Sequence, residues 1–270
     1  MKGVNTSLTV VFGALLALTR TAVPALALTS ISSCPANITQ PGNYQLTADL
    51  VCTVSISASN VSLKLNGHII TPPNNADGID VNVSGSERLN HVGIQGPGLI
   101  TGASDGILIQ NADYSQVSLV TIKDSNAGIY ALSNSFLTVG SNVIGGAGAF
   151  GIDLLSCTSC VVSGNDTSGG STGIVLNGAG AANTVNNNTT NGNNFVGINI
   201  AEGTGARVYG NVTNGNRAAG ILVQTTGAQV FSNISALANG TDDLYDTSAT
   251  CSGNLWSNDV FLTRNASCIH

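Results

Sequence analysis

Residues 151–188 read GIDLLSCTSCVVSGNDTSGGSTGIVLNGAGAANTVNNN, and this stretch contains two copies of one pattern. Each copy begins with a Gly-Ile pair, continues to a valine and ends on an asparagine a few residues later. Seven such pairs occur, at intervals of 22 to 28 residues: Gly78-Ile79, Gly106-Ile107, Gly128-Ile129, Gly151-Ile152, Gly173-Ile174, Gly197-Ile198 and Gly220-Ile221. A repeat of roughly 20–50 residues is typical of architectures in which each unit stacks on the next.

Each pair opens a short alternating segment, such as Ile152 and Leu154 around Asp153. A period of two indicates a β-strand that directs the flanking residues to one face and the middle residue to the other. Stacked strands lie about 4.8 Å apart, so the isoleucines would form an interior column. The asparagines would stack at a turn: Asn142, Asn165, Asn188, Asn211 and Asn233. The sequence therefore predicts an all-β fold, a single parallel β-helix (solenoid) of about 23 residues per coil. A leucine-rich repeat would need a Leu-x-x-Leu-x-Leu consensus, which is missing.

The first 27 residues have the composition of a secretory signal peptide. Lys2 precedes an apolar core, Leu8 to Leu18, and Ala25-Leu26-Ala27 forms a small-x-small cleavage site. A membrane-spanning helix needs about 20 apolar residues, so an uncleaved anchor is the lesser alternative. We expect a secreted, periplasmic or cell-surface protein without a transmembrane segment. Its mature part would be one domain, 28–270, with 28–60 as the N-terminal cap and first strands and 241–270 as the C-terminal cap.

The chain is acidic and poor in charge, with a formal net charge of −6 and 8% charged residues. Loss of Lys2 and Arg20 with the signal peptide would make the net charge −8. Nucleic acids and anionic membranes attract basic patches. We therefore expect no nucleic-acid partner.

Six cysteines form three local pairs: Cys34 with Cys52, Cys157 with Cys160, and Cys251 with Cys268. Export favours disulfides, although sequence alone leaves many connectivities open. The outer pairs would close the two ends of the solenoid, where strand edges need covering. For Cys157-x-x-Cys160 we expect a structural turn disulfide or two stacked thiols. A redox role normally uses a helix N-terminus to lower the thiol pKa, and no helix is predicted there.

The middle residues of the alternating segments would face outward, and they include several polar groups that suit a sugar. The candidate substrate-binding residues are Asp80, Asn82, Tyr130, Asp153, Asn177 and Asn199. Aromatic residues make up only 4% of the chain, whereas tight sugar-binding faces usually offer aromatic platforms. This composition argues against a tight, lectin-like role.

Asp77 and Asp105 each precede a repeat glycine and form the candidate catalytic pair. Neighbouring coils would bring them roughly 5 Å apart, where like charges raise one pKa and allow acid/base chemistry. With Asp80 they could equally bind calcium. Asp80 and Asp153 lie three coils, or roughly 14 Å, apart and cannot act together as glycosidase carboxyls. The alternative is that Asp-Gly forms the turn that enters a strand.

The chain resembles the right-handed parallel β-helix repeat proteins of the pectin-lyase-like superfamily. The resemblance includes Val61-Ser62-Leu63-Lys64-Leu65-Asn66-Gly67-His68, which looks like a first coil of that group. It also includes the closing pattern Asp243-Leu244-Tyr245-Asp246, Cys251, Asn254-Leu255-Trp256, Asn258 and Cys268-Ile269. The resemblance implies the right-handed fold, while that superfamily contains lyases, hydrolases, epimerases and surface proteins.

A local resemblance concerns polygalacturonases. Asn75-Ala76-Asp77-Gly78-Ile79-Asp80 is similar to their Asn-Thr-Asp-Gly-Ile-Asp, and Ala103-Ser104-Asp105-Gly106-Ile107 stands where they have Gly-Asp-Asp-Cys-Ile. Ser104 replaces the first aspartate of that pair. Asn126-Ala127-Gly128 replaces their Gly-His-Gly, and Thr121-Ile122-Lys123 echoes their Arg-Ile-Lys. Most of the machinery that the resemblance would imply is therefore absent.

Two functional hypotheses follow. The first is a secreted, non-catalytic or weakly carbohydrate-binding protein of the envelope or exterior. The alternative is a polysaccharide-degrading hydrolase or lyase that uses Asp77 and Asp105. In both cases we expect polysaccharide as the partner, a monomer, and no cofactor or metal, with calcium the one metal considered.

Overall fold

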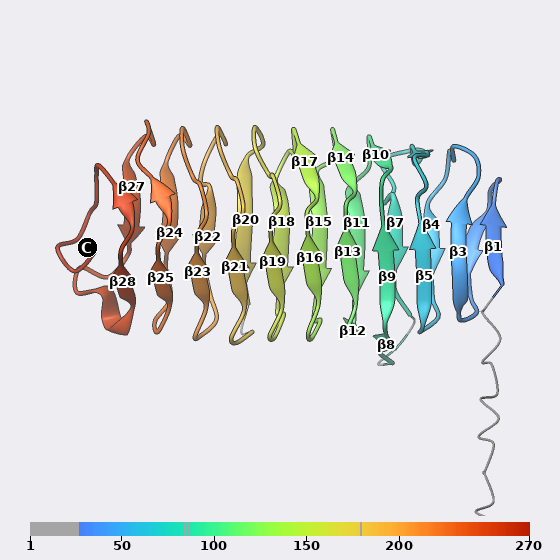
Figure 1. Cartoon of the computed structure of the whole chain (residues 1–270), viewed down its shortest axis with the longest axis horizontal. Coiled ribbons are helices and arrows are strands. Elements are labelled where there is room, and N and C mark those ends of the chain that lie inside the picture. Colours follow the sequence, from blue (N-terminus) through green and yellow to red (C-terminus); the bar gives the residue numbers. More distant parts are fainter. Residues whose placement is uncertain (1–26, 84, 86, 179) are drawn as a thin grey trace, which may run out of the picture.

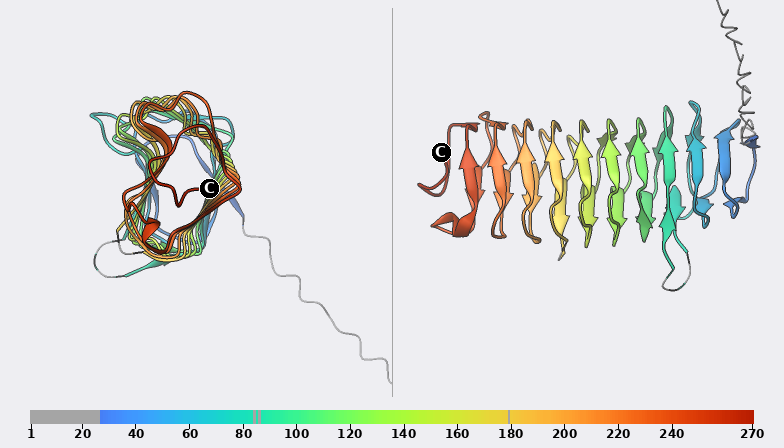
Figure 2. Two further views of the ribbon diagram at one scale, coloured as in Figure 1. Left: turned by 90° about the vertical axis from the view of Figure 1, so that its left-hand side faces the viewer. Right: turned by 60° about the horizontal axis from the view of Figure 1, so that its bottom comes forward.

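Strands of successive coils pair in parallel along the length of the molecule, which forms a single row of stacked coils (Figure 1). The computed structural model describes residues 27–83, 85, 87–178 and 180–270. The predicted signal peptide therefore lies, apart from Ala27, outside the described residues. Viewed along the long axis, the coils superpose on one closed outline (Figure 2). This is the predicted parallel β-helix, while the cap boundaries at 60 and 241 stay predictions.

Two long sheets, named A and B, run along most of the described chain. Sheet A has eleven strands: β1 (Leu28–Ile31), β3 (Gly42–Leu46), β5 (Val61–Lys64), β9 (Val92–Gln95), β13 (Gln116–Ser118), β16 (Thr138–Gly140), β19 (Val161–Ser163), β21 (Thr184–Asn186), β23 (Arg207–Tyr209), β25 (Gln229–Phe231) and β28 (Leu255–Ser257). Sheet B has ten: β2 (Ala36–Ile38), β4 (Val54–Ile56), β7 (Ile79–Val81), β11 (Asp105–Gln110), β15 (Ala127–Leu132), β18 (Phe150–Leu155), β20 (Thr172–Asn177), β22 (Ile198–Ile200), β24 (Ala219–Val223) and β27 (Asp242–Asp246).

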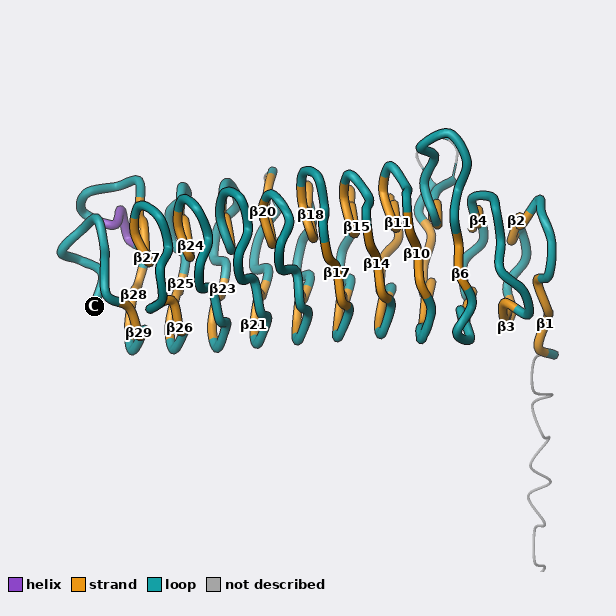
Figure 3. The backbone as a smooth tube through the Cα atoms, turned by 90° about the horizontal axis from the view of Figure 1, so that it is seen from above, coloured by secondary structure: helices purple, strands orange, loops and turns teal. Residues whose placement is uncertain are grey.

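A third face is shorter and less regular (Figure 3). Its four-stranded sheet consists of β6 (Ile69–Ile70), β10 (Leu99–Thr101), β14 (Thr121–Lys123) and β17 (Val143–Gly145). Two further pairs are β8 (Leu89–Asn90) with β12 (Ala112–Asp113), and β26 (Ile234–Ser235) with β29 (Val260–Phe261). Within the described ranges, the helical structure is a 3₁₀ turn, η1 (Cys251–Gly253).

The isoleucines of the Gly-Ile pairs form the predicted interior column. They pair in register from β7 to β24 and are all 0% exposed: Ile79, Ile107, Ile129, Ile152, Ile174, Ile198 and Ile221. Burial of each such side chain contributes roughly 1.5–3 kcal/mol before the entropy cost of ordering the coil.

The glycines of the pairs are required by the close approach of successive coils. A Cβ atom on Gly151 would lie 2.5 Å from the carbonyl oxygen of Gly173 and 2.7 Å from Cβ of Thr167. A Cβ atom on Gly173 would lie 2.5 Å from the carbonyl oxygen of Gly197. These distances are shorter than the sum of the van der Waals radii, so the added Cβ atom would clash with the backbone of the next coil. The glycine is therefore a packing constraint that repeats once per coil.

The predicted asparagine ladder is present at a buried turn. The backbone N–H and the side-chain amide of Asn165 both donate to Oδ1 of Asn188, at 2.9 and 3.0 Å. The same pair of hydrogen bonds links each asparagine of the ladder to the next, from Asn142 to Asn233. Asn233 in turn donates twice to Oδ1 of Asp259, which ends the ladder. Buried backbone groups at this turn are thus satisfied by the neighbouring coil.

The terminal cysteines form the two expected bridges, whereas the central pair does not. Cys34–Cys52 and Cys251–Cys268 have Cα–Cα distances of 6.2 and 6.1 Å. The expectation of a turn disulfide at Cys157 and Cys160 is wrong, since both are free and buried. The alternative, two neighbouring thiols, is correct.

Truncation of the interior column should destabilise the protein. We expect Ile174→Ala to lower the free energy of unfolding by about 2–5 kcal/mol, because it leaves a cavity in a close-packed core. The matched control is Val143→Ala, at a side chain that is 49% exposed, with an expected change of at most about 0.5 kcal/mol. Urea denaturation followed by far-UV circular dichroism measures both. Equal losses in the two variants would contradict the column.

Candidate functional site

The outer face of sheet B, the face directed away from the core, presents one row of side chains in register. Residues of this row alternate with the buried isoleucines, so they point outward. In coil order the row is Asp80, Leu108, Tyr130, Asp153, Val175, Asn199, Leu222 and Tyr245. The first seven are the outward residues that the alternation predicts.

The outer face is hollowed beside β11, β15 and β18. This pocket of about 190 Å³, here called the acidic pocket, is lined by Asp105, Asn126, Ala127, Tyr130, Phe150 and Asp153. Asp105 is in register with Ala127 and Phe150, and Tyr130 with Asp153. Three consecutive coils therefore supply its walls, and none of the lining residues is a cation.

Asp153 is the most unusual group of the pocket. Only 5% of the residue is exposed, and its Oδ1 atom has no hydrogen-bond partner. Burial, followed by the charge of Asp105, raises its pKa to about 6. Burial of an unpaired carboxylate costs free energy, so this environment favours the protonated, neutral form of Asp153.

Asp105 shares this environment and adjoins two further acids. Burial, followed by the charge of Asp77, raises the pKa of Asp105 to about 6. Asp77 Oδ1 accepts a hydrogen bond from the backbone N–H of Asp105 at 3.1 Å. The pKa of Asp80 is also raised, by burial and then by the charge of Asp77. The candidate pair is thus adjacent, but the Asp77 carboxylate binds backbone while Asp105 lines the pocket.

The remaining predicted binding residues are spread along sheet B. Tyr130 and Asp153 are neighbours, whereas Val175 separates Asp153 from Asn199. Asn177 Oδ1 accepts the backbone N–H of Gly178, at the end of β20. Asn82 follows β7 and lies away from the pocket lining.

Sequence reasoning missed Phe150 and Asn126, which line the acidic pocket. It also missed a second, apolar pocket farther along the same face, lined by Phe195, Val196, Ala218, Ala219, Leu222, Thr241 and Tyr245. Leu222 is three coils beyond Asp153 in the outward row. The sequence signal for this second pocket was Phe195, an aromatic residue two positions before the repeat glycine Gly197. The Phe195 side chain is half exposed in the fold.

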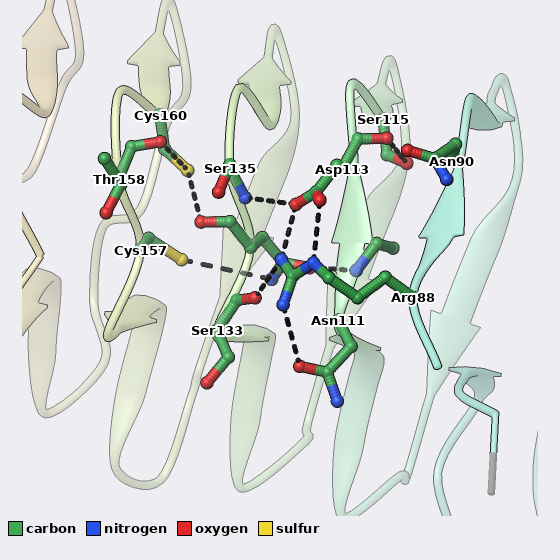
Figure 4. A network of polar contacts seen from close by, with 12 residues as sticks. Arg88, Asn90, Asn111, Asp113, Ser115, Ser133, Ser135, Cys157, Thr158 and Cys160 are labelled. Carbon is green, nitrogen blue, oxygen red and sulfur yellow. Dashed lines mark hydrogen bonds and ion pairs between the residues drawn. The ribbon is translucent and has the colours of Figure 1, made fainter. Parts of the chain in front are cut away.

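A second polar cluster lies at another corner of the solenoid (Figure 4). Arg88 donates through Nε and Nη2 to both carboxylate oxygens of Asp113, and through Nη1 to Asn111 Oδ1. The hydrogen bond from Arg88 is the main cause that lowers the pKa of Asp113. The Arg88 guanidinium also donates to the backbone carbonyl oxygen of Ser133, so the cluster joins successive coils.

The cysteine pair lies behind that cluster, inside the core. Asn134 donates to Cys157 Sγ at 3.9 Å and accepts from Cys160 Sγ at 3.6 Å through its carbonyl oxygen. Across the described part of the chain, no group of three or more His, Cys, Asp or Glu residues is arranged to hold a metal ion. His68 contacts Asp49, and His91 stacks on Tyr114. The donor set gives no support to the calcium site that was considered for Asp77, Asp80 and Asp105.

The pKa of Asp153 should make stability depend on pH. Its folded pKa of about 6 lies above the ordinary value, so its ionisation destabilises the fold as pH rises from about 4 to 6. We expect Asp153→Asn to be more stable than the wild type at pH 7, by about 1–3 kcal/mol, and to lose this advantage at pH 4. Urea denaturation across this range measures the difference. A constant difference at all pH values would contradict the assignment.

Solved structures with the same fold include carbohydrate-active proteins. The chain is similar to the periplasmic alginate epimerase AlgG, with 14% identity over 86% of this chain and 73% of that one and a TM-score of 0.63. For an alginate lyase from Paenibacillus sp. the identity is 15%, the coverage 88% and 99%, and the TM-score 0.62. For polygalacturonase from Erwinia carotovora the identity is 13%, the coverage is 90% of this chain and 95% of that one, and the TM-score is 0.55. At these identities the similarity shows the fold alone, a parallel β-helix.

No curated protein matches the chain. Among the described residues, no helix is long and apolar enough to cross a membrane. One family, described as periplasmic copper-binding protein (NosD), matches residues 73–266. Its periplasmic description agrees with the predicted export. Because the match covers most of the chain and all seven Gly-Ile pairs, this chain belongs to the NosD family of β-helix proteins.

Proposed function

We propose that this protein binds a carbohydrate chain along the outer face of sheet B, as an exported β-helix protein without an obligatory catalytic role. The observation that carries the proposal is the pair of hollows in one outward row. The acidic pocket supplies carboxylate and phenol groups, and the apolar pocket supplies Leu222 and Tyr245. Three coils, or roughly 14 Å, separate Asp153 from Leu222, a distance that an oligosaccharide can span.

The chemistry of the two pockets suits sugars. Carboxylates accept hydrogen bonds from sugar hydroxyls, and charge-assisted bonds of this kind are stronger than neutral ones. Aromatic side chains supply large apolar surfaces for the C–H faces of sugar rings. Phe150 borders the first pocket, and Phe195 and Tyr245 border the second. The names of the similar structures include alginate epimerase, alginate lyase and polygalacturonase, which supports a carbohydrate ligand in general and no particular sugar.

Copper binding, which the family description suggests, fits the described residues poorly. Copper sites draw on imidazole and sulfur ligands. The described histidines include His68, bonded to Asp49, and His91, stacked on Tyr114. Cys157 and Cys160 are two donors without a third, enclosed in the hydrophobic core. We therefore assign no copper-dependent step to this chain.

Binding should depend on the outer face of sheet B. We expect Tyr130→Ala to weaken binding of responsive oligosaccharides at least about fivefold, because it removes one wall of the acidic pocket. The matched control is Tyr209→Ala, an aromatic residue of β23 in sheet A. A glycan array followed by isothermal titration calorimetry measures the effect. Equal losses in both variants would contradict binding at sheet B, and no bound glycan would contradict the function.

Hydrolysis is the second candidate, and one observation favours it: Asp105 and Asp153 share a pocket and both have a pKa of about 6. Two coils and three residues separate their backbones, and the charge of Asp105 contributes to the raised pKa of Asp153. An inverting mechanism would require their side chains to bring the two carboxyls to roughly 6.5–9.5 Å from each other, with a water between them. The acid/base pair of this hypothesis is Asp105 with Asp153, instead of Asp105 with Asp77. Asp77 would hold the backbone of Asp105 through its accepted hydrogen bond.

An enzyme of this kind should work best near pH 6, where one carboxyl is protonated and the other ionised. We expect Asp105→Asn and Asp153→Asn each to reduce hydrolysis by about 100-fold or more, since each removes an acid/base group. Asp166→Asn, at an exposed acid on another face, is the control. Release of reducing ends from a polysaccharide panel measures activity. A wild-type protein that releases none would leave binding as the function.

A further inference from the structure

The charge around the acidic pocket points to the class of sugar that it takes. Asp105 and Asp153 line the pocket, and Asp77 and Asp80 adjoin Asp105. The lining contains no lysine, arginine or histidine. Four carboxyl groups thus lie in one region of a face that supplies no cation from its own lining.

Asp153 also has a hydrogen-bond acceptor that no group of the protein satisfies. Its Oδ1 atom is buried and unpartnered, in a residue that is 95% enclosed and lines the pocket. The neighbouring outward residues are Tyr130 on one coil and Val175 on the next, and Val175 has no side-chain donor. A buried acceptor without a donor is an incomplete interaction, which a ligand donor can complete.

Three classes of sugar differ in how well they match the negative charge and the unpaired acceptor of the acidic pocket. A uronate would bring a further negative charge next to unscreened carboxylates, so repulsion disfavours it. A neutral sugar can donate hydroxyls but leaves the negative charge uncompensated. An ammonium group both donates hydrogen bonds and compensates the charge, and it can also contact the faces of Tyr130 and Phe150.

We infer that the acidic pocket binds the ammonium group of an amino sugar, so that the preferred glycan carries free amines and not carboxylates or N-acetyl groups. The inference rests on the proposed carbohydrate binding and names its ligand class. The ammonium would pair with the carboxyl groups of Asp153 and Asp105, with the sugar ring against Phe150. The rest of the chain would extend along the outward row toward Leu222.

The test compares three hexasaccharides of matched length by isothermal titration calorimetry with the full mature protein. They are hexa-glucosamine, its fully N-acetylated form and hexa-mannuronate. We expect hexa-glucosamine to bind at least about tenfold more tightly than the N-acetylated form, with hexa-mannuronate weakest. The preference should shrink at high salt, because charge pairs are screened.

Two isosteric variants assign the preference to the pocket. Asp153→Asn and Asp105→Asn should each bring the affinities for the amine and its N-acetylated form to within about threefold, because each removes one charge. Asp166→Asn should keep the full preference. Far-UV circular dichroism confirms folding, and two separate pocket variants keep the test decisive if one of them does not fold.

A permanently cationic probe separates the titration of the protein from that of the ligand. Binding of N,N,N-trimethylated hexa-glucosamine should strengthen as pH rises from 5 to 7, because the pocket carboxyls with pKa values of about 6 become ionised. The increase should be smaller in Asp153→Asn, where Asp105 is the remaining carboxyl of the pocket lining that titrates in this range. Since the trimethylammonium group has no N–H donor, the pH dependence of its binding reports charge compensation without a hydrogen bond from the nitrogen.

The outcomes distinguish the inference from the function beneath it. Equal affinities for the amine and N-acetylated probes would overturn the amino-sugar inference and leave carbohydrate binding intact. No binding of any probe, together with an unresponsive glycan array, would overturn both. Calcium that binds and displaces hexa-glucosamine would make the pocket a cation site and overturn the inference.

Discussion

The close contact between the glycines of successive Gly-Ile pairs is the constraint on which the rest of the structure depends. A side chain at Gly151 or Gly173 would collide with the carbonyl oxygen of the next coil. Contact at this distance holds adjacent coils in one register. Once the register is set, every other position in the repeat becomes a column. The interior isoleucines, the asparagine ladder and the outward row on sheet B are three columns of the same lattice.

The columns differ in how strongly the repeat restricts them. Interior positions must be apolar, and the turn asparagines must bond both to one another and to the backbone. Outward positions carry no such requirement, so each coil can present a different side chain there. The acidic pocket results from this freedom, because Asp105, Tyr130 and Asp153 come from three successive coils. The core residues and the candidate binding residues Tyr130 and Asp153 thus occupy opposite faces of the same strands.

The family description and the local chemistry point in different directions. The NosD family is named for copper, yet the described side chains include no converging set of three metal donors, and the buried cysteines lie within the core. Among the described residues, the buried side-chain atoms without a hydrogen-bond partner include carboxylate oxygens of Asp80 and Asp153 on the outer face of sheet B. A solenoid tolerates such divergence because its stability comes from neighbouring coils, while its outer surface can change independently.

The sequence by itself determined the coil length, the isoleucine column and the asparagine ladder, because each reflects contacts between equivalent positions of a repeat. It favoured the two terminal disulfides by the local pairing of the cysteines, and the structure settled their connectivity. It also identified Asp105, Tyr130 and Asp153 as outward or near-outward polar residues. Only the tertiary structure decided that these three share a pocket with Phe150, and that the Asp77 carboxylate binds the backbone of Asp105. It also decided that Cys157 and Cys160 are not joined by a disulfide. These outcomes depend on burial and on side-chain directions across several coils, and a one-dimensional repeat pattern contains neither.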